Sequence, residues 1–197
     1  MQYPRGESIE ARGRTLRRLA RWADTAIRSW KLIDAQTDVD GSKDFLNPHR
    51  PYLVVAAHGH RELGLLYLNA LFESRTDTVN IEAVRQHLQK HGFATATIKA
   101  DINQHRDALK KLYMLRGAAI GHRTGARSYD ETFAAARMTV DELDSLLDFA
   151  SRSTSALAKL IGLPPEPPRI DPVENLDKML QCLADTEQRE RMASPWN

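Results

Sequence analysis

The stretch TVDELDSLLDFASRSTSALAKLIG (residues 139–162) decides the fold class of this chain. Its apolar residues recur every three or four positions, which is the period of an amphipathic helix: Leu143, Leu146, Leu147, Phe149, Ala150, Leu157 and Leu160. Thr139 and Glu142 have the spacing of a capping box, which satisfies backbone N–H groups at a helix start. Gly162 and the proline pair shortly after it are typical of a helix end. We therefore predict a helix over residues 140–160.

The same helical period recurs along most of the chain, and no segment alternates as a strand would. We expect further helices over residues 8–34, 52–73, 81–90, 172–188, and from Asp101 into the sequence LRGAAIGHRTGAR. Asn80 is placed as the N-cap of the short helix, and His91-Gly92 ends it. The predicted fold class is all-α: a four-helix up-and-down bundle with a short extra helix and a C-terminal helical tail. The predicted domains are residues 8–162 for the bundle and 163–197 for the linker and tail.

The second long helix, over residues 52–73, is apolar nearly all round. Its apolar residues include Val55, Leu63, Leu66, Tyr67, Ala70 and Leu71. A helix without a polar face is usually buried on all sides, so we expect it at the centre of the bundle.

Composition excludes several classes of protein. With 28 Lys and Arg against 26 Asp and Glu in 197 residues, the net charge of +2 excludes a uniformly basic binder. The longest apolar run, residues 52–57, is far short of the ~20 residues that span a membrane, and no apolar segment follows Met1 as a secretory signal would require. The single cysteine, Cys182, excludes an internal disulfide and a cysteine-based zinc site. We expect a cytoplasmic protein without a metal or cofactor.

One acidic stretch superficially resembles a calcium loop: Asp38, Asp40, Gly41 and Asp44. The loop pattern would place Gln36 at the first ligand position and Asn47 at the twelfth, where a bidentate glutamate belongs. The mismatch favours a polar turn.

Two pairs of residues lie one helical turn apart and include a histidine. His87 and His91 have a spacing that suits a metal, but no nearby carboxylate completes a site, so two exposed histidines are the favoured interpretation. His58 and Glu62 lie in the apolar second helix. A partly buried pair there is either a structural hydrogen bond or one wall of a functional cleft.

The first predicted helix carries an arginine-rich face, hereafter the arginine face: Arg12, Arg14, Arg17, Arg18, Arg21 and Arg28. From Arg5 to Lys31 there are eight basic and three acidic residues, a local net charge of +5. Such a stripe attracts phosphate backbones, although a simply solvated face has the same composition.

A second basic segment, residues 106–127, contains the residues most suggestive of chemistry. Arg106, Lys110, Tyr113 and Arg116 fall within roughly a third of the helix circumference at about 100° per residue. His122 follows Arg116 by six positions, so in an unbroken helix the two side chains would diverge by about 120°. Gly121 offers a place for the helix to bend just before the histidine. No bend is needed if two chains face each other and each contributes its residues to one site.

The string LRGAAIGHR resembles the signature of the HEPN superfamily, an arginine separated from a histidine by four to six residues near the end of a helix. Here the pair is Arg116 and His122. The helix order over roughly residues 8–162, including the downstream DELDSLLDFA, is similar to that of the abortive-infection (phage-resistance) subgroup of HEPN proteins.

This resemblance implies a dimeric four-helix bundle whose two Arg–His pairs line one cleft, and a metal-independent endoribonuclease acting in phage defence or as a toxin. His122 would take the proton from a ribose 2′-hydroxyl, and Arg116 would bind the scissile phosphate. Residues assigned to RNA binding are Arg106, Lys110, Tyr113 and Arg123. The expected partners are RNA, a second copy of the chain, and an antitoxin or other protein; no membrane and no metal are expected.

The chain departs from the family pattern at two positions. Gly117 follows the arginine where many active members have a polar residue, and Thr124 stands where some toxin members carry a tyrosine that a partner enzyme modifies. Regulation by that modification is therefore not expected. Two alternatives to a ribonuclease stay open: a HEPN-like dimer that binds nucleic acid or a protein without cleaving, and a structural helical adaptor.

The C-terminal tail begins with the stiff Pro-rich sequence PPEPPRIDP. Its predicted helix has one apolar stripe, formed by Leu176, Met179, Leu180 and Leu183, which something must cover. Acidic residues on its flanks suggest that it lies against the arginine face between Arg14 and Arg21 and restrains RNA binding; a tail that merely packs is the alternative.

Overall fold

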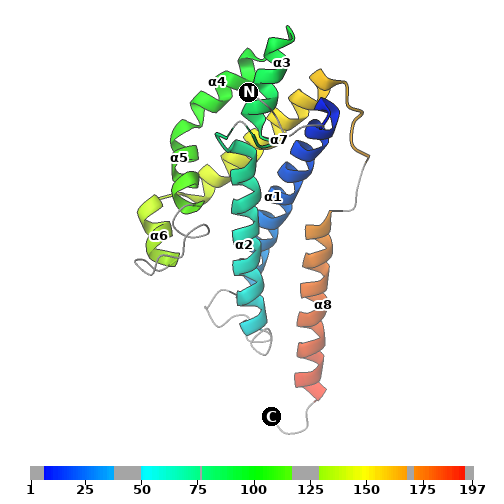
Figure 1. Cartoon of the computed structure of the whole chain (residues 1–197). Coiled ribbons are helices and arrows are strands. Elements are labelled where there is room, and N and C mark those ends of the chain that lie inside the picture. Colours follow the sequence, from blue (N-terminus) through cyan, green and yellow to red (C-terminus); the bar gives the residue numbers. More distant parts are fainter. Residues whose placement is uncertain (1–6, 38–49, 76, 117–128, 168–170, 194–197) are drawn as a thin grey trace. The chain divides into compact units, whose positions relative to one another are not determined.

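The structure is a computed structural model, which describes residues 7–37, 50–75, 77–116, 129–167 and 171–193. In these ranges the chain forms no strand, and the prediction of an all-α fold is confirmed. The helices (Figure 1) are α1 (Ile9–Thr37), α2 (Arg50–Phe72), α3 (Ile81–Lys90), α4 (Ala96–Gln104), α5 (Arg106–Leu115), α6 (Tyr129–Ala136), α7 (Val140–Ile161) and α8 (Pro172–Ala193). None of the described helices is long and apolar enough to cross a membrane.

Helix ends follow the local sequence signals closely. Thr139 Oγ1 accepts from the backbone N–H of Glu142 at 3.1 Å, and the Glu142 carboxylate accepts from the Thr139 N–H at 2.9 Å, which completes the predicted capping box. Gly162 ends α7 in the left-handed conformation, with φ of 80°, that glycine adopts without steric cost. Asn80 caps α3 by accepting from the Ala83 N–H at 2.8 Å.

The prediction of one unbroken helix starting at Asp101 is wrong about where the helix starts and about its continuity. It starts at Ala96, so Asp101 lies inside it, and it breaks at His105 into α4 and α5. At the break the His105 ring bonds to the Asp101 carbonyl at 2.8 Å and stacks on Phe149, with ring centroids 4.6 Å apart. This side-chain contact with α7 produces the break, and no proline or glycine signals it in the sequence.

The expectation that α2 is buried all round is also wrong. Helix α2 buries one side, including Leu65, Leu68 and Leu71, and exposes apolar residues on the other: Tyr52, Val55, Leu63 and Leu66. Neighbouring helices cover only one of its faces, which an apolar composition alone does not reveal.

The chain packs as two compact units, each combining segments that are distant in the sequence. Unit 1 comprises residues 1–24 and 65–166, and unit 2 comprises residues 25–64 and 167–197. The predicted domain boundary after residue 162 would instead cut the chain once, into two continuous segments, and that boundary stays a prediction.

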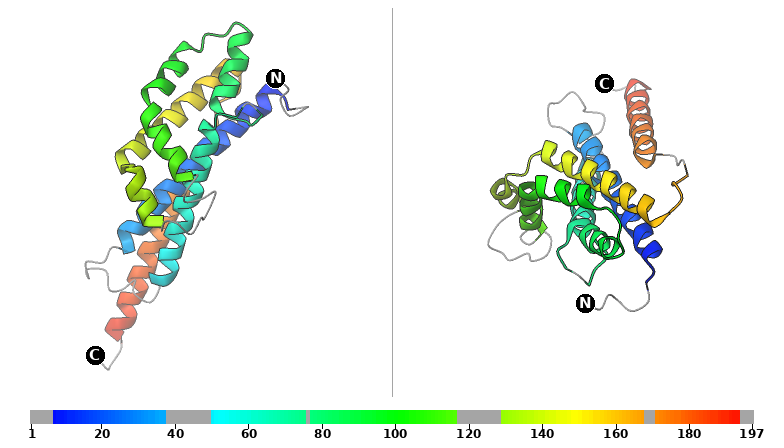
Figure 2. Two further views of the ribbon diagram at one scale, coloured as in Figure 1. Left: turned by 60° about the vertical axis from the view of Figure 1, so that its left-hand side comes forward. Right: turned by 90° about the horizontal axis from the view of Figure 1, so that it is seen from above.

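Phe149 of α7 lies at the centre of the core of unit 1. Its ring stacks on Phe72 at the end of α2, with centroids 5.0 Å apart. It also stacks on His105 at the break between α4 and α5. Helix α7 contacts α3 and α5, and α5 and α6 lie side by side in both views of Figure 2. One fully buried aromatic ring therefore connects α2, α7 and the α4–α5 break.

Unit 2 is built around the second half of α1, the first part of α2, and α8. Ile33, Leu53, Ala57 and Leu180 form its buried cluster, with Leu176 packed against them. Helix α2 approaches α1 closely at Gly64, where an added Cβ would lie 3.2 Å from the Ile27 backbone nitrogen. The predicted tail stripe is therefore covered in part by the chain's own α1 and α2.

We expect Leu180→Ala to lower the free energy of unfolding by about 2–5 kcal/mol, because it leaves a cavity in the buried cluster of unit 2. Leu180 is 2% exposed, whereas the neighbouring Met179 is 51% exposed. Met179→Ala is thus the matched control, with an expected loss of at most about 0.5 kcal/mol. Urea denaturation followed by circular dichroism measures both, and equal losses would show that α8 does not pack as described.

Candidate functional site

The end of α2 and the helix α5 are joined by a set of side-chain contacts, hereafter the α2–α5 contact. Asn69 Nδ2 donates to the Leu112 carbonyl at 3.2 Å, and the Tyr113 hydroxyl donates to the Phe72 carbonyl. Arg116 Nη1 lies 3.1 Å from Glu73 Oε1. These three interactions follow one another along both segments, so they fix the position of α5 at its C-terminal end.

Arg116, the predicted phosphate-binding residue, lies at the end of α5 within this contact. Its side chain is 46% exposed, whereas that of Glu73 is 14% exposed. The guanidinium offers five N–H donors, and the contact with Glu73 engages a single terminal nitrogen. The arrangement orients the arginine while its other donors can still reach an incoming anion.

Tyr113, predicted to contact RNA, has a structural task in this geometry. Carbonyls in the last turn of a helix have no partner within that helix, and the Tyr113 hydroxyl supplies one for Phe72. Burial and the Glu73 carboxylate raise the pKa of Tyr113, so its phenol stays protonated and able to donate. Its ring remains partly exposed, beside Arg116 on the same helix.

The other predicted site residues are distributed unevenly. Arg106 and Lys110 lie exposed on α5, and Lys110 Nζ contacts Asp107 Oδ1 at 2.8 Å across one turn. His122 and Arg123 lie outside the described residues, as does Gly117. The described part of the site therefore consists of Arg116 and Tyr113 held against the end of α2, with Arg106 and Lys110 further along the same helix.

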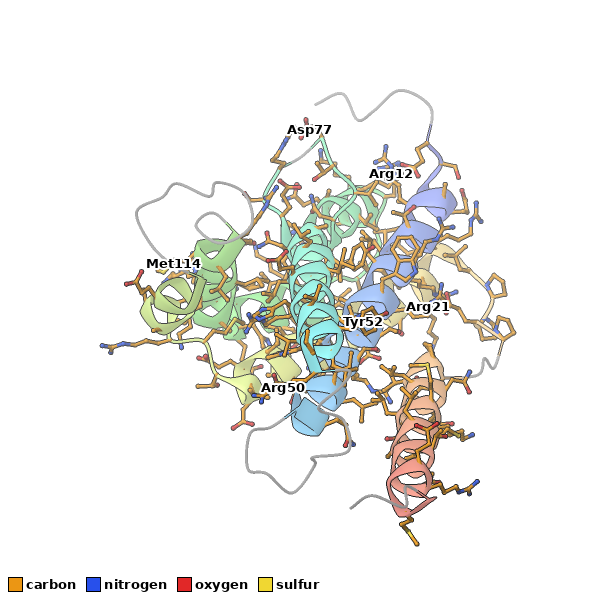
Figure 3. The ribbon with its side chains drawn as sticks, turned by 90° about the horizontal axis from the view of Figure 1, so that it is seen from below. Arg12, Arg21, Arg50, Tyr52, Asp77 and Met114 are labelled. Carbon is orange, nitrogen blue, oxygen red and sulfur yellow. The ribbon has the colours of Figure 1, made fainter. Side chains whose placement is uncertain are left out.

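The arginine face of α1 is occupied by the chain itself to a large extent. In unit 1, Arg17 Nη1 donates to the Pro164 carbonyl at 2.6 Å. Arg21, which Figure 3 labels, pairs through Nη1 with Glu166 Oε2 at 2.6 Å. Arg18 lies over the ring of Trp22, 5.7 Å from its centroid. The acid that contacts this part of the face belongs to the Pro-rich segment, where the sequence analysis expected the tail helix.

A similar pairing occurs in unit 2. Arg28 Nη2 contacts Asp171 Oδ2 at 2.7 Å, and the other oxygen of Asp171 accepts from the Val173 N–H at the start of α8. The Val173 N–H and then Arg28 lower the pKa of Asp171, so this carboxylate contributes stability at neutral pH that is lost as the pH falls through its depressed pKa.

A groove of about 550 Å³ lies in unit 1 between α1, α7 and the Pro-rich segment. Its lining mixes both signs of charge with hydroxyl groups, and includes Arg17, Arg21, Asp24, Asp148, Ser151 and Glu166. Because two arginines and three carboxylates share this lining, the groove has no strong excess of either charge to select an anionic or a cationic ligand.

The candidate metal and cleft residues take structural roles. The rings of His87 and His91 pack 4.4 Å apart, and His91 Nδ1 contacts the His87 carbonyl. Among the described residues no group of three or more His, Cys, Asp or Glu is placed to hold a metal ion.

His58, the candidate for a cleft wall, is exposed, contrary to the partly buried pair that was expected, and its Nδ1 accepts from Arg61 Nη2 at 2.8 Å. The acidic stretch from Asp38 to Asp44 lies outside the described residues.

Comparisons with models of protein families, with curated proteins and with solved structures find no match to this chain. The resemblance to HEPN proteins therefore rests on the sequence pattern given above.

Glu73 and Asn69 are the site residues that the sequence analysis missed. A glutamate just beyond a helix C-terminus faces the negative end of the helix dipole and is unfavourable there without a cation. That local conflict was a usable signal that Glu73 pairs with a basic residue. Asn69 gave none, because a lone amide in an apolar helix has too many possible partners.

We expect Tyr113→Phe to lower the free energy of unfolding by about 1 kcal/mol, because the Phe72 carbonyl loses its donor. Tyr52→Phe is the matched control, since Tyr52 lies exposed in the first turn of α2 and should change stability little. Chemical denaturation of the two variants and the unchanged chain tests this. Indistinguishable stabilities would contradict a structural hydrogen bond at Tyr113.

Proposed function

We propose that this chain is a metal-independent endoribonuclease of HEPN type, acting as a homodimer in the cytoplasm in phage defence or as a toxin. In this proposal α1, α2, the α4–α5 pair and α7 are the four long helices of a HEPN-like up-and-down bundle. Arg116 and His122 carry the chemistry, and Arg106, Lys110, Tyr113 and Arg123 bind the RNA. An antitoxin or other protein partner belongs to the same proposal.

The observation that carries the proposal is the position of Arg116. An arginine at a helix end, half exposed and oriented by the nearly buried Glu73, is suited to meet a phosphate group in a defined geometry. Arg106 and Lys110 add exposed positive charge along α5, which supports binding of a phosphate backbone at this helix rather than at the arginine face.

The reaction needs only groups that this chain contains. His122 removes the proton from a ribose 2′-hydroxyl, and the 2′-oxygen attacks the adjacent phosphorus. The bond from phosphorus to the 5′-oxygen breaks, that oxygen takes up a proton from water, and the His122 imidazolium returns its own proton to water. Arg116 stabilises the negative charge that grows on the phosphate oxygens. The products are a 2′,3′-cyclic phosphate and a 5′-hydroxyl.

We expect the chain to cleave single-stranded RNA in the presence of EDTA, and His122→Ala to reduce the rate about 10²–10⁴-fold through loss of the general base. Arg116→Ala should reduce it about 10²–10³-fold, because the developing charge loses its donor. A time course on fluorescent RNA measures these rates.

The matched control for Arg116 is Arg75→Ala, which removes another exposed arginine held by a carboxylate, with Arg75 Nη2 and Asp77 Oδ2 2.6 Å apart. Its rate should stay near that of the unchanged chain. Equal losses in both arginine variants would point to general electrostatics, and cleavage that survives His122→Ala would overturn the assignment. Salt-sensitive RNA binding without cleavage would establish the non-catalytic alternative instead.

A further inference from the structure

We propose that unit 1 has a site on Trp22, where α1 meets α2, on which an unpaired RNA base stacks while Arg14 and Arg18 bind the phosphates beside it. A single strand reaches this site from Arg116 across the exposed face of α2. The inference deepens the proposed function, because it takes from that function that RNA lies at Arg116. It adds a second contact for the strand and does not depend on cleavage.

Trp22 lies at the junction of α1 and α2, between an aromatic and a cationic neighbour. Its ring centroid is 5.2 Å from that of Tyr67, with the two planes tilted by 44°, and the guanidinium of Arg18 lies over it at 5.7 Å. With both neighbours in place, Trp22 is still 43% exposed. Unpaired RNA bases stack on aromatic rings and on guanidinium planes, so this group of side chains is suited to hold one.

The contact between Arg18 and Trp22 leaves the site available to a base. At an exposed position a cation–π contact is weaker than the stacking of a base on an aromatic ring. A base can therefore replace the guanidinium over the indole. The displaced guanidinium then lies beside the base, where the phosphate of the same nucleotide is an anion that it can bind.

Arg14 and Arg18 are the part of the arginine face that lies beside Trp22. The three residues follow one another at intervals of four, so their side chains point within about 80° of one another. Within the ranges that the structure describes, neither arginine forms an ion pair, and Arg14 acts on Glu10, one turn earlier, through its charge alone. The neighbouring arginines of the face contact the Pro-rich segment instead. Two cations therefore remain beside the indole for an incoming anion.

The exposed face of α2 connects this site to Arg116. Tyr67 marks one edge of the face, where it contacts Trp22 of α1. Glu73, just beyond the last turn of α2, marks the other edge, where it contacts Arg116 of α5. By the helical period the two edges lie about 120° apart around α2 and about 9 Å apart along its axis. A few nucleotides of a single strand span that separation.

The surface between the two edges is apolar and open. Ala70, which is partly exposed, points midway between them, about 60° from each. Leu66, one turn earlier, is 38% exposed. Figure 3 shows Met114 of α5 on one side of α2 and Arg12 of α1 on the other. The bases of a strand can therefore lie on apolar surface while its phosphates reach arginines at both edges.

The combination of an exposed indole with two arginines favours a single strand over other partners. A duplex keeps its bases paired inside the helix, so it offers phosphates to the arginines but no base to Trp22. An apolar protein segment would cover the indole but would leave Arg14 and Arg18 without an anion.

The first experiment measures the binding of a labelled single-stranded 2′-O-methyl RNA to the full chain by fluorescence anisotropy. This probe is not cleaved, because its 2′-oxygen is blocked. We expect Trp22→Leu, which keeps an apolar side chain but has no ring, to raise the Kd about 5–150-fold through loss of one stacked base. Trp22→Phe should keep most of the affinity, because a ring remains. Phe93→Ala is the matched control, an aromatic residue of unit 1 that is 42% exposed, and it should leave the Kd unchanged.

The second experiment separates stacking from charge with inorganic polyphosphate, which has phosphates but no bases. Trp22→Leu should leave polyphosphate binding unchanged. Arg14→Gln and Arg18→Gln should each weaken the binding of both probes, and each should reduce the slope of log affinity against log salt for RNA by about 0.7. Arg152→Gln is the control for both, because Arg152 is an exposed arginine of α7. Circular dichroism checks that the variants are folded.

Three results would overturn the inference: a full chain that does not bind the RNA probe, an RNA affinity that Trp22→Leu leaves unchanged, or an equal loss of RNA and polyphosphate binding in that variant. The last result would mean that Trp22 only supports the fold.

These outcomes separate the stacking site from the chemistry. RNA binding that depends on Trp22, together with unmodified RNA that stays intact, supports this site and refutes the proposed ribonuclease. Cleavage in EDTA by a chain whose RNA binding is insensitive to Trp22→Leu does the reverse.

Discussion

A hydrogen bond from the Tyr113 hydroxyl to the carbonyl of Phe72, the last residue of α2, fixes where the candidate phosphate-binding arginine lies. A helix end must find partners for its last carbonyls, and here α5 supplies one from its side. The neighbouring contacts, Asn69 with the Leu112 carbonyl and Glu73 with Arg116, extend the same junction from residue 69 to 73 and from residue 112 to 116. The Phe72 ring also stacks on Phe149, so the hydrophobic core of unit 1 and the orientation of Arg116 depend on the same turn of α2.

The chain is nearly neutral overall, yet it has two basic surfaces whose side chains make different contacts. On α1 the chain's own carbonyl and carboxylate groups engage Arg17, Arg21 and Arg28, so much of that positive charge holds the Pro-rich segment and the start of α8. On α5, Arg106 and Lys110 are exposed, with Lys110 paired only with Asp107 of the same helix, and Arg116 is partly engaged by Glu73. Charge counted along a sequence cannot distinguish these cases, because the neutralising groups lie more than 140 residues away.

What the sequence predicted well is local. The capping box at Thr139, the N-cap at Asn80 and the left-handed end at Gly162 depend on residues within one turn, and all are confirmed. What it missed depends on contacts between helices. The break at His105 arises from a ring stacking on Phe149, and the pairing of Glu73 with Arg116 joins residues 43 positions apart. The exposed face of α2 was mistaken for a buried one because an apolar residue in a sequence does not reveal whether it lies in a core or on the surface. The assignment of Arg116 to the site comes from its spacing to His122, and it stays a prediction.

The chemistry of the cleaved RNA ends tests the proposed activity most directly. Attack by a ribose 2′-hydroxyl leaves a 2′,3′-cyclic phosphate on one fragment and a 5′-hydroxyl on the other, whereas attack by water activated on a metal typically leaves a phosphate on one end and free hydroxyls on the other. Mass spectrometry of fragments produced by the full chain in EDTA distinguishes the two. We expect cyclic phosphates that disappear with His122→Ala. Fragments that carry 5′-phosphates, or cleavage that requires an added divalent metal, would contradict the roles assigned to Arg116 and His122.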